Sequence, residues 1–315
     1  MLFEFDETYF KDEERSGFLI TECMKRYWAA ALRTVEIFDE ICRRYNLSYW
    51  ADCGSMLGAF RHHGFIPWDD DIDLGMPRKD YNLFLEIAEK ELPEGFFVSR
   101  YESNVHKYNG TTVVINHQGT LFSSEILGEY YNCPFPVGFD LYPYDNVPDD
   151  ENELQKWRLD YLRCLHEIRT MREDMEKEGN VDFEKLKEKV DEAEIVAARY
   201  AGSDTENMTR FIFMALENKS EVLKRKWCDI QMEMPFETAT IPVPLYIEEV
   251  LLSRFGADYV RSVKAASAHN YPLYKRDIVG MMEFLKNGGI ELKDLPPILQ
   301  YIRREAEYRG IYKEK

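Results

Sequence analysis

The sequence predicts an α/β protein with a mixed front half and a helical back half. Up to residue 150, short apolar or alternating runs bounded by Gly and Pro lie between amphipathic stretches, which is typical of strands alternating with helices. From residue 152 to about 228 the chain is charged, has helical periodicity and has few β-branched runs. The acidic, turn-rich "DNVPDDEN" between them predicts a boundary near residue 150. We therefore expect two parts, residues 1–150 and residues 151–315, the second packing on the first.

The first half divides into helices and strands by local pattern. Apolar side chains at helical spacing from Leu19 to Cys42 predict an amphipathic helix over residues 17–46 that ends near Asn46. "LSYWADCG" predicts a short strand before a glycine turn, and Ser55 is placed to cap a helix in "SMLGAF". Further strands are expected in "IPWDDDIDLGMP", "FFVSRY", "TTVVINH" and "GFDLYPY", and a further helix in "RKDYNLFLEIAEKEL".

The second half is expected to be mostly helical. The turn-rich segments "EKEGNVD" and "AGSDTEN" divide residues 152–228 into three helices. Their heptads are not sustained, so packed amphipathic helices are favoured over a coiled coil. A loop or hairpin in "MPFETATIPVP", a helix in "YIEEVLLSRFG" and an amphipathic stretch in "IVGMMEFLKNG" follow.

Composition limits the classes of partner. The formal net charge is −18, from 58 acidic and 40 basic residues, and such a surface disfavours binding to nucleic acid or to anionic lipid. No apolar run reaches the roughly 18 residues that span a bilayer, and the acidic N-terminus does not resemble a signal peptide. The six cysteines show no metal spacing and are expected to be reduced thiols. We therefore expect a cytoplasmic protein with no stable membrane insertion.

The segment "GFIPWDDDIDLGM" at residues 64–76 places four carboxylates in five positions. Two like charges about 4 Å apart repel by roughly 4 kcal/mol at an effective dielectric near 20. If the segment is a strand, Asp71 and Asp73 share one face while Ile72 and Leu74 point into the core. Oxygen-only ligands select Mg²⁺ before Mn²⁺, and Mg²⁺ commonly completes its shell with substrate phosphates. The cluster thus predicts a metal–phosphate site.

Other interpretations of this cluster fit less well, with one exception. A solvated acidic loop does not explain the alternating Ile72 and Leu74. An EF-hand would need glycine where Leu74 stands and glutamate where Asp80 stands. An aspartate-rich prenyl-diphosphate site would need a helix, which Gly75 and Pro77 disfavour. A glycosyltransferase DxD site, which also binds a nucleotide diphosphate through a divalent ion, stays open.

The residues upstream favour phosphate binding. "DCGSMLGAFRHHGF" supplies a strand, a Gly-Ser turn and a helix N-terminus, whose backbone N–H groups suit phosphate. Gly54 lets the backbone approach a ligand closely, and Ser55 follows it. Arg61 and His62 add cationic or hydrogen-bonding capacity.

The segment "YWADCGSMLGAFRHHGFIPWDDDIDLGMPRKDYNLF" closely resembles the signature of the LicD family, which includes bacterial phosphocholine transferases and the fukutin-related proteins. "FDLYPYDNVP" and "PFETATIPVPLYIEEVLLSRFGADY" extend the similarity. The resemblance implies a nucleotidyltransferase-like fold, with a small mixed sheet and flanking helices, over the catalytic residues 1–150. It implies that Asp71 and Asp73 bind the metal, and that Asp140 is a third carboxylate on a neighbouring strand.

The resemblance also implies a reaction. Family members move a phospho-alcohol from a CDP-activated donor to a sugar hydroxyl of a surface glycan or its lipid-linked precursor, such as lipopolysaccharide or teichoic acid. Mg²⁺ on Asp71 and Asp73 would hold the pyrophosphate, Asp140 would orient or deprotonate the attacking hydroxyl, and Arg61 and His62 would contact phosphate oxygens. A true nucleotidyltransferase that uses an NTP, and a non-catalytic binding module, stay open as alternatives.

The donor alcohol is predicted from aromatic residues near the third carboxylate. Aromatic faces bind quaternary ammonium groups, and four tyrosines lie in or shortly before "GFDLYPY" in the sequence. This pattern favours CDP-choline over CDP-ribitol and CDP-glycerol. The tyrosines are Tyr130, Tyr131, Tyr142 and Tyr144.

Overall fold

The structure confirms the α/β class and the mixed sheet. It is a computed structural model that describes residues 3–100, 112–115, 124–210, 221–264, 271–289 and 292–312. Within these ranges, seven strands form one sheet in the order β3-β4-β7-β6-β5, and β8 and β9 extend it from β7. The strands are β3 Trp50–Ala51, β4 Asp73–Pro77, β5 Phe97–Ser99, β6 Thr112–Ile115, β7 Gly138–Val147, β8 Asn207–Arg210 and β9 Val222–Lys224.

Strands β4 and β7 lie at the centre of the sheet and run parallel. Their register places Asp73 opposite Asp140 and Leu74 opposite Leu141. Because side chains alternate along a strand, the aspartates occupy one face and the leucines the other. Leu74 and Leu141 are fully buried. One face of the central strands is therefore core, and the other presents the carboxylates.

The helix expected from residue 17 begins later, because the N-terminal residues form a hairpin. Ser16 and Gly17 have φ angles of 54° and 72°, which is the left-handed conformation of a two-residue hairpin turn. Leu19, expected on the helix, lies on the second strand of this hairpin. The two strands are β1 Glu13–Arg15 and β2 Phe18–Ile20.

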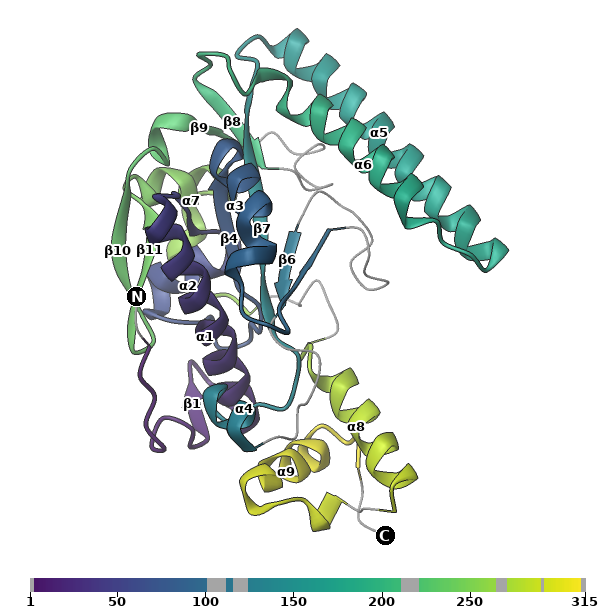
Figure 1. The fold of residues 1–315 in the computed structure, drawn as a ribbon. Helices are drawn as coiled ribbons and strands as arrows, with labels where there is room; N and C mark the ends of the chain where they lie inside the picture. The colour runs from purple at the N-terminus through teal and green to yellow at the C-terminus, as the bar shows by residue number, and fades with distance from the viewer. Residues whose placement is uncertain are drawn as a thin grey trace.

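Helix α1 spans Glu22–Tyr45 and crosses the core face of the sheet (Figure 1). The Thr21 side chain accepts a hydrogen bond from the Met24 N–H and caps its first turn. Asn46 ends the helix in a left-handed conformation, as predicted. The Phe38 ring lies 5.0 Å from the Phe139 ring of β7, centroid to centroid, so α1 covers the apolar face.

The other helices match several sequence expectations. The helices expected at residues 55–60, 78–92 and 246–256 are present with shifted ends, and the amphipathic stretch at 278–288 is helical. Helices α4 and α9 have no predicted counterpart. In chain order, the helices just described are α2 Cys53–His62, α3 Arg78–Glu91, α4 Ser124–Glu129, α7 Ile247–Phe255, α8 Lys275–Asn287 and α9 Gln300–Tyr308.

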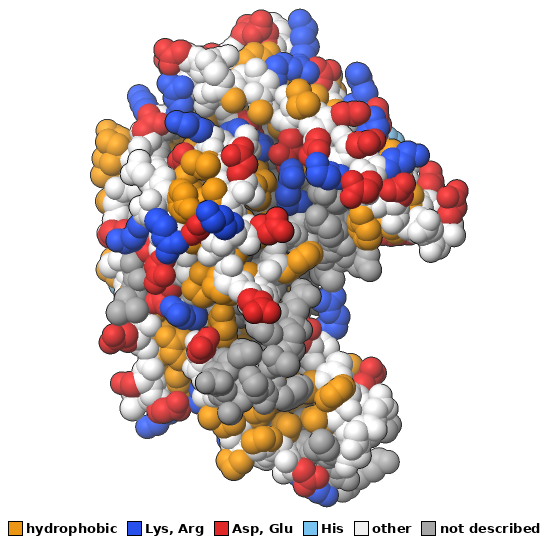
Figure 2. All heavy atoms as spheres, in the orientation of Figure 1, with side chains coloured by type: hydrophobic (Ala, Val, Ile, Leu, Met, Phe, Trp, Pro, Cys, Tyr) orange, Lys and Arg blue, Asp and Glu red, His pale blue; other side chains and the backbone are white. Residues whose placement is uncertain are grey.

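Two long helices of the second half form a hairpin that projects from the sheet (Figure 1). They are α5 Glu151–Glu178 and α6 Phe183–Ala197, and they confirm the first two of the three expected helices. Trp157, Tyr161 and Leu186 belong to a core of their own, apart from the main one. Figure 2 shows acidic and basic side chains interspersed over this projection, as expected of a solvated helical pair.

The third helix, expected after "AGSDTEN", is contradicted at both of its ends, where the structure has the strands β8 and β9. Strand β8 pairs antiparallel with the second part of β7, and β9 pairs with β8. These strands are three or four residues long, too short for local pattern to reveal, and pairing with β7 determines their conformation. Residues 211–220 between them lie outside the described ranges, as do the ends of the strands expected at 96–101 and 111–117.

The remaining second half packs against the first. Strands β10 Gln231–Phe236 and β11 Ala239–Pro244 form the expected hairpin. Phe236, Ile241 and Ile302 share one hydrophobic core with Trp28 and Phe38 of α1. Among the described residues, no helix combines the length and apolar character needed to cross a bilayer. The division at residue 150 stays a prediction.

Candidate functional site

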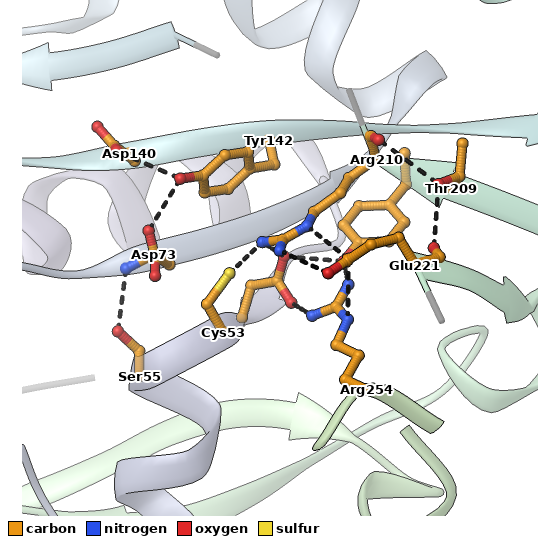
Figure 3. Close-up of polar contacts among 11 residues, drawn as sticks. Cys53, Ser55, Asp73, Asp140, Tyr142, Thr209, Arg210, Glu221 and Arg254 are labelled. Atoms are coloured by element: carbon orange, nitrogen blue, oxygen red, sulfur yellow. Dashed lines mark hydrogen bonds and ion pairs between the residues drawn. The ribbon is translucent and has the colours of Figure 1, made fainter. Parts of the chain in front are cut away.

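The site begins with two carboxylates on the parallel strands β4 and β7. Asp73 and Asp140 lie in register, and the Asp140 N–H donates to the Ile72 carbonyl at 2.8 Å. The Ser55 hydroxyl accepts a hydrogen bond from the Asp73 N–H at 2.9 Å. The structure thus brings three of the predicted site residues, Ser55, Asp73 and Asp140, to one face of the sheet (Figure 3).

Three more carboxylates precede β4. Asp69, Asp70 and Asp71 each offer an oxygen atom, all within 4.8 Å of one another. Burial and the charge of Asp71 raise the pKa of Asp69 to about 9. Burial, Asp71 and Asp140 likewise raise the pKa of Asp73. Asp71 therefore lies near both groups of carboxylates, and the whole cluster is crowded enough to retain protons unless a cation balances its charge.

Helix α2 begins beside these carboxylates. A Cβ atom at Gly54 would lie only 2.5 Å from Oδ2 of Asp69, so any side chain at this position would displace the Asp69 carboxylate. The helix begins at Cys53 with Asp52 as its N-cap residue. Ser55 is therefore not the cap that the sequence predicted, since its hydroxyl binds the β4 backbone instead.

A buried polar network supports the start of α2 (Figure 3). Asp52 has no exposed surface and accepts hydrogen bonds from the Tyr144 hydroxyl at 2.8 Å and from Arg210 Nη1 at 3.2 Å. Arg254 Nη1 also donates to Asp52. Burial alone would raise the pKa of Asp52, but Arg254 and Arg210 hold it at about 2. Glu221 completes the network, accepting from Arg210 Nε at 3.1 Å.

Arg61 and His62 are not brought to the carboxylates. Arg61 lies near the far end of α2, about 10 Å along the helix axis from Gly54, and its Nε donates to the Tyr259 carbonyl. The His62 ring lies 6.4 Å from the Trp68 ring, centroid to centroid. Burial and Arg61 lower the pKa of His62, which disfavours the charged imidazolium that would attract phosphate. Their predicted phosphate contacts stay predictions without support from this geometry.

The contacts of three of the four tyrosines give the predicted aromatic cage no support. Tyr131 packs against Phe5 near the N-terminus, with ring centroids 5.2 Å apart. The Arg210 guanidinium lies over the Tyr142 ring at 5.1 Å, and the Tyr144 hydroxyl belongs to the Asp52 network. Tyr142 and Tyr144 lie on the same face of β7 as Asp140, but guanidinium groups of Arg210 and Arg254 already lie over their rings. The preference for CDP-choline therefore stays a prediction that this geometry does not support.

Sequence reasoning missed the two buried arginines. Arg210 and Arg254 lie on β8 and α7, both in the second half. Arg254 falls in "PFETATIPVPLYIEEVLLSRFGADY", one of the segments that resemble the LicD family, but nothing local indicates that its side chain is buried. Arg210 falls where a helix was expected, and no local signal identifies it.

Comparisons with known proteins find relatives of part of the chain. Residues 46–147 match the family model described as LicD/FKTN/FKRP, nucleotidyltransferase domain. The chain is 33% identical over 119 residues to the lipopolysaccharide cholinephosphotransferase LicD of Haemophilus influenzae, covering 38% of this chain and 43% of that protein. It is 29% identical over 136 residues to an uncharacterized protein of Rickettsia prowazekii, covering 40% and 51%.

A mammalian relative also matches part of the chain. The identity to the ribitol 5-phosphate transferase FKRP of Mus musculus is 29% over 115 residues, covering 32% of this chain and 23% of that protein. The matched part is thus about half or less of the length of each of these relatives. The matched residues include the Gly-Ser turn, the aspartate cluster and Asp140. Residues 46–147 of this chain are a nucleotidyltransferase domain of the LicD family.

Proposed function

We propose that the protein transfers a phospho-alcohol from a CDP-activated donor to a sugar hydroxyl of a cell-surface glycan or its lipid-linked precursor. Two relatives are named as transferases of cholinephosphate and of ribitol 5-phosphate. The observation that carries the proposal is the register of β4 and β7, which sets Asp73 beside Asp140 within reach of the aspartate cluster. The partners are small molecules and glycans rather than nucleic acid, in keeping with the net charge of −18.

The carboxylate cluster fits a hard divalent cation. Its donors are all oxygen atoms, and those of Asp69, Asp70 and Asp71 lie within 4.8 Å of one another. We propose Asp71 and Asp73 as the ligands of Mg²⁺, with Mn²⁺ as a substitute. When bound, the cation supplies positive charge that balances the donor pyrophosphate and the leaving CMP.

The chain's own groups orient the reactants. We assign to Asp140 the attacking sugar hydroxyl, whose proton its carboxylate accepts as the oxygen bonds to the donor phosphorus. The bond from phosphorus to the CMP oxygen breaks in the same transfer. Ser55 fixes the start of β4 through the Asp73 N–H, and Gly54 keeps the α2 backbone close to Asp69. The contacts of the tyrosines do not support choline as the donor alcohol. The cytoplasmic location stays a prediction.

A nucleotidyltransferase that uses an NTP and releases pyrophosphate is the second candidate. The matched domain carries that description, and the same carboxylates would serve it. The two reactions leave different products, CMP or pyrophosphate.

A donor screen tests the proposal. Thermal unfolding is measured with CDP-choline, CDP-ribitol, CDP-glycerol and the NTPs, each with and without Mg²⁺, followed by product analysis with a sugar acceptor. We expect Mg²⁺-dependent stabilisation by at least one CDP-alcohol and release of CMP. Stabilisation by NTPs alone, with pyrophosphate released, would instead establish the second candidate.

The Asp140→Asn variant tests the role of the third carboxylate. An amide is a far poorer proton acceptor, so we expect kcat to fall by about 100-fold or more, while the KM for the donor stays near its wild-type value. Steady-state kinetics at saturating Mg²⁺ separates the two parameters. Loss of donor affinity with an unchanged kcat would remove Asp140 from this role.

A further inference from the structure

The Tyr142 hydroxyl lies between the two in-register carboxylates. It is 3.1 Å from Oδ1 of Asp73 and 3.3 Å from Oδ2 of Asp140 (Figure 3). A phenol has one proton and two lone pairs, so it donates to one carboxylate at a time while its oxygen stays beside both. The hydroxyl therefore links the candidate metal ligand to the candidate proton acceptor.

The ring that carries this hydroxyl is held in place from several directions. Tyr142 follows Asp140 by two residues on β7, so both side chains lie on the same face. Gly75 stands opposite Tyr142 in the register, and the Trp50 and Tyr144 rings fill the space where its Cβ atom would lie. The Arg210 guanidinium lies over the ring at 5.1 Å, and Glu221 fixes that guanidinium. The position of the hydroxyl is thus set by the sheet and by a buried ion pair.

We propose that Tyr142 is a positioning residue, which orients the Asp73 carboxylate toward the metal and the Asp140 carboxylate toward the attacking hydroxyl. This inference rests on the proposed function. Hydrogen bonds to the groups that bind a metal typically change metal affinity or activity by about 10–100-fold. Carboxylates that otherwise repel each other depend especially on such a donor, because it lets them stay close without a bound cation.

The Tyr142→Phe variant removes the hydroxyl and keeps the ring. Its matched control is Tyr49→Phe, since the Tyr49 hydroxyl is also buried and donates to a carboxylate, Oδ1 of Asp39 at 2.8 Å, away from the cluster. Mn²⁺ binding to the metal-free protein is measured by calorimetry, and kcat and KM are measured with the donor found in the screen. In Tyr142→Phe we expect Mn²⁺ affinity and kcat each to fall by about tenfold or more, with KM for the donor unchanged.

The outcomes are separable. Wild-type Mn²⁺ affinity and kcat in Tyr142→Phe would overturn the inference, and so would equal losses in Tyr142→Phe and Tyr49→Phe, which indicate a general loosening of the fold. If the wild-type protein turns over no donor, the proposed function fails. The Mn²⁺ affinities of the two variants then decide the role of Tyr142 by themselves.

Discussion

The Asp73→Asn variant is expected to lose metal-dependent transfer almost completely while keeping its fold. Asp73 lies beside Asp140 in the register, and its raised pKa reflects burial together with Asp71 and Asp140. An amide cannot replace the charge that holds a divalent cation, so a loss of several kcal/mol of transition-state stabilisation, about a thousandfold in kcat, is expected. Asp71→Asn should behave in the same way.

The same variant should not unfold. Removing one of several crowded carboxylates relieves repulsion, so the metal-free variant is expected to be at least as stable as the wild type in urea. The matched control is Asp174→Asn, an exposed aspartate of α5 that pairs with Lys177, which should keep full activity. Metal-dependent turnover of Asp73→Asn at a rate comparable to the control would exclude Asp73 from the site.

The Arg254→Met variant is expected to be the most damaging to stability. Arg254 and Arg210 together balance Asp52 and Glu221, and the Arg254 side chain is only 2% exposed. Without it, two buried carboxylates share the single cation of Arg210, and breaking a buried ion pair typically costs about 3–5 kcal/mol in the free energy of unfolding. Urea unfolding followed by circular dichroism measures the loss.

Two further variants show whether charge is the cause. Adding Asp52→Asn to Arg254→Met restores the balance of charge and is expected to recover part of the lost stability, which a double-mutant cycle measures. Lys187→Met breaks the exposed pair with Asp191 and should cost no more than about 1 kcal/mol. Strictly additive losses, or a loss in Arg254→Met no larger than in Lys187→Met, would show that the network does not depend on its charges.

Local chemistry made much of the first half predictable. Asn46 ends α1 because asparagine tolerates the left-handed conformation of a helix C-cap. The alternation of Ile72 and Leu74 correctly indicated which side chains of this segment point into the core. The N-terminal hairpin was missed because its strands are three residues long, and over so few positions strand and helix patterns coincide. Its signal was "SG" at residues 16 and 17, the kind of dipeptide that marks a tight turn.

The site was predictable only where its residues share a short segment or a family signature. Asp71 and Asp73 come from the acidic cluster, and Asp140 comes from the resemblance. Arg210 and Arg254 lie 158 and 202 residues from Asp52. In sequence, a charged residue on an amphipathic segment indicates a solvated face. Only the tertiary contact makes it a buried partner.

This separation along the chain has a consequence for biosynthesis. When the ribosome has made the first 150 residues, every carboxylate of the site exists, but neither arginine of the Asp52 network does. Contacts between residues so far apart form slowly, and Asp52 cannot be buried favourably until a cation reaches it. We therefore expect the site of the nascent chain to form only after β8 and α7 have been synthesised. Synthesis of the second half thereby sets the time at which a competent site first exists.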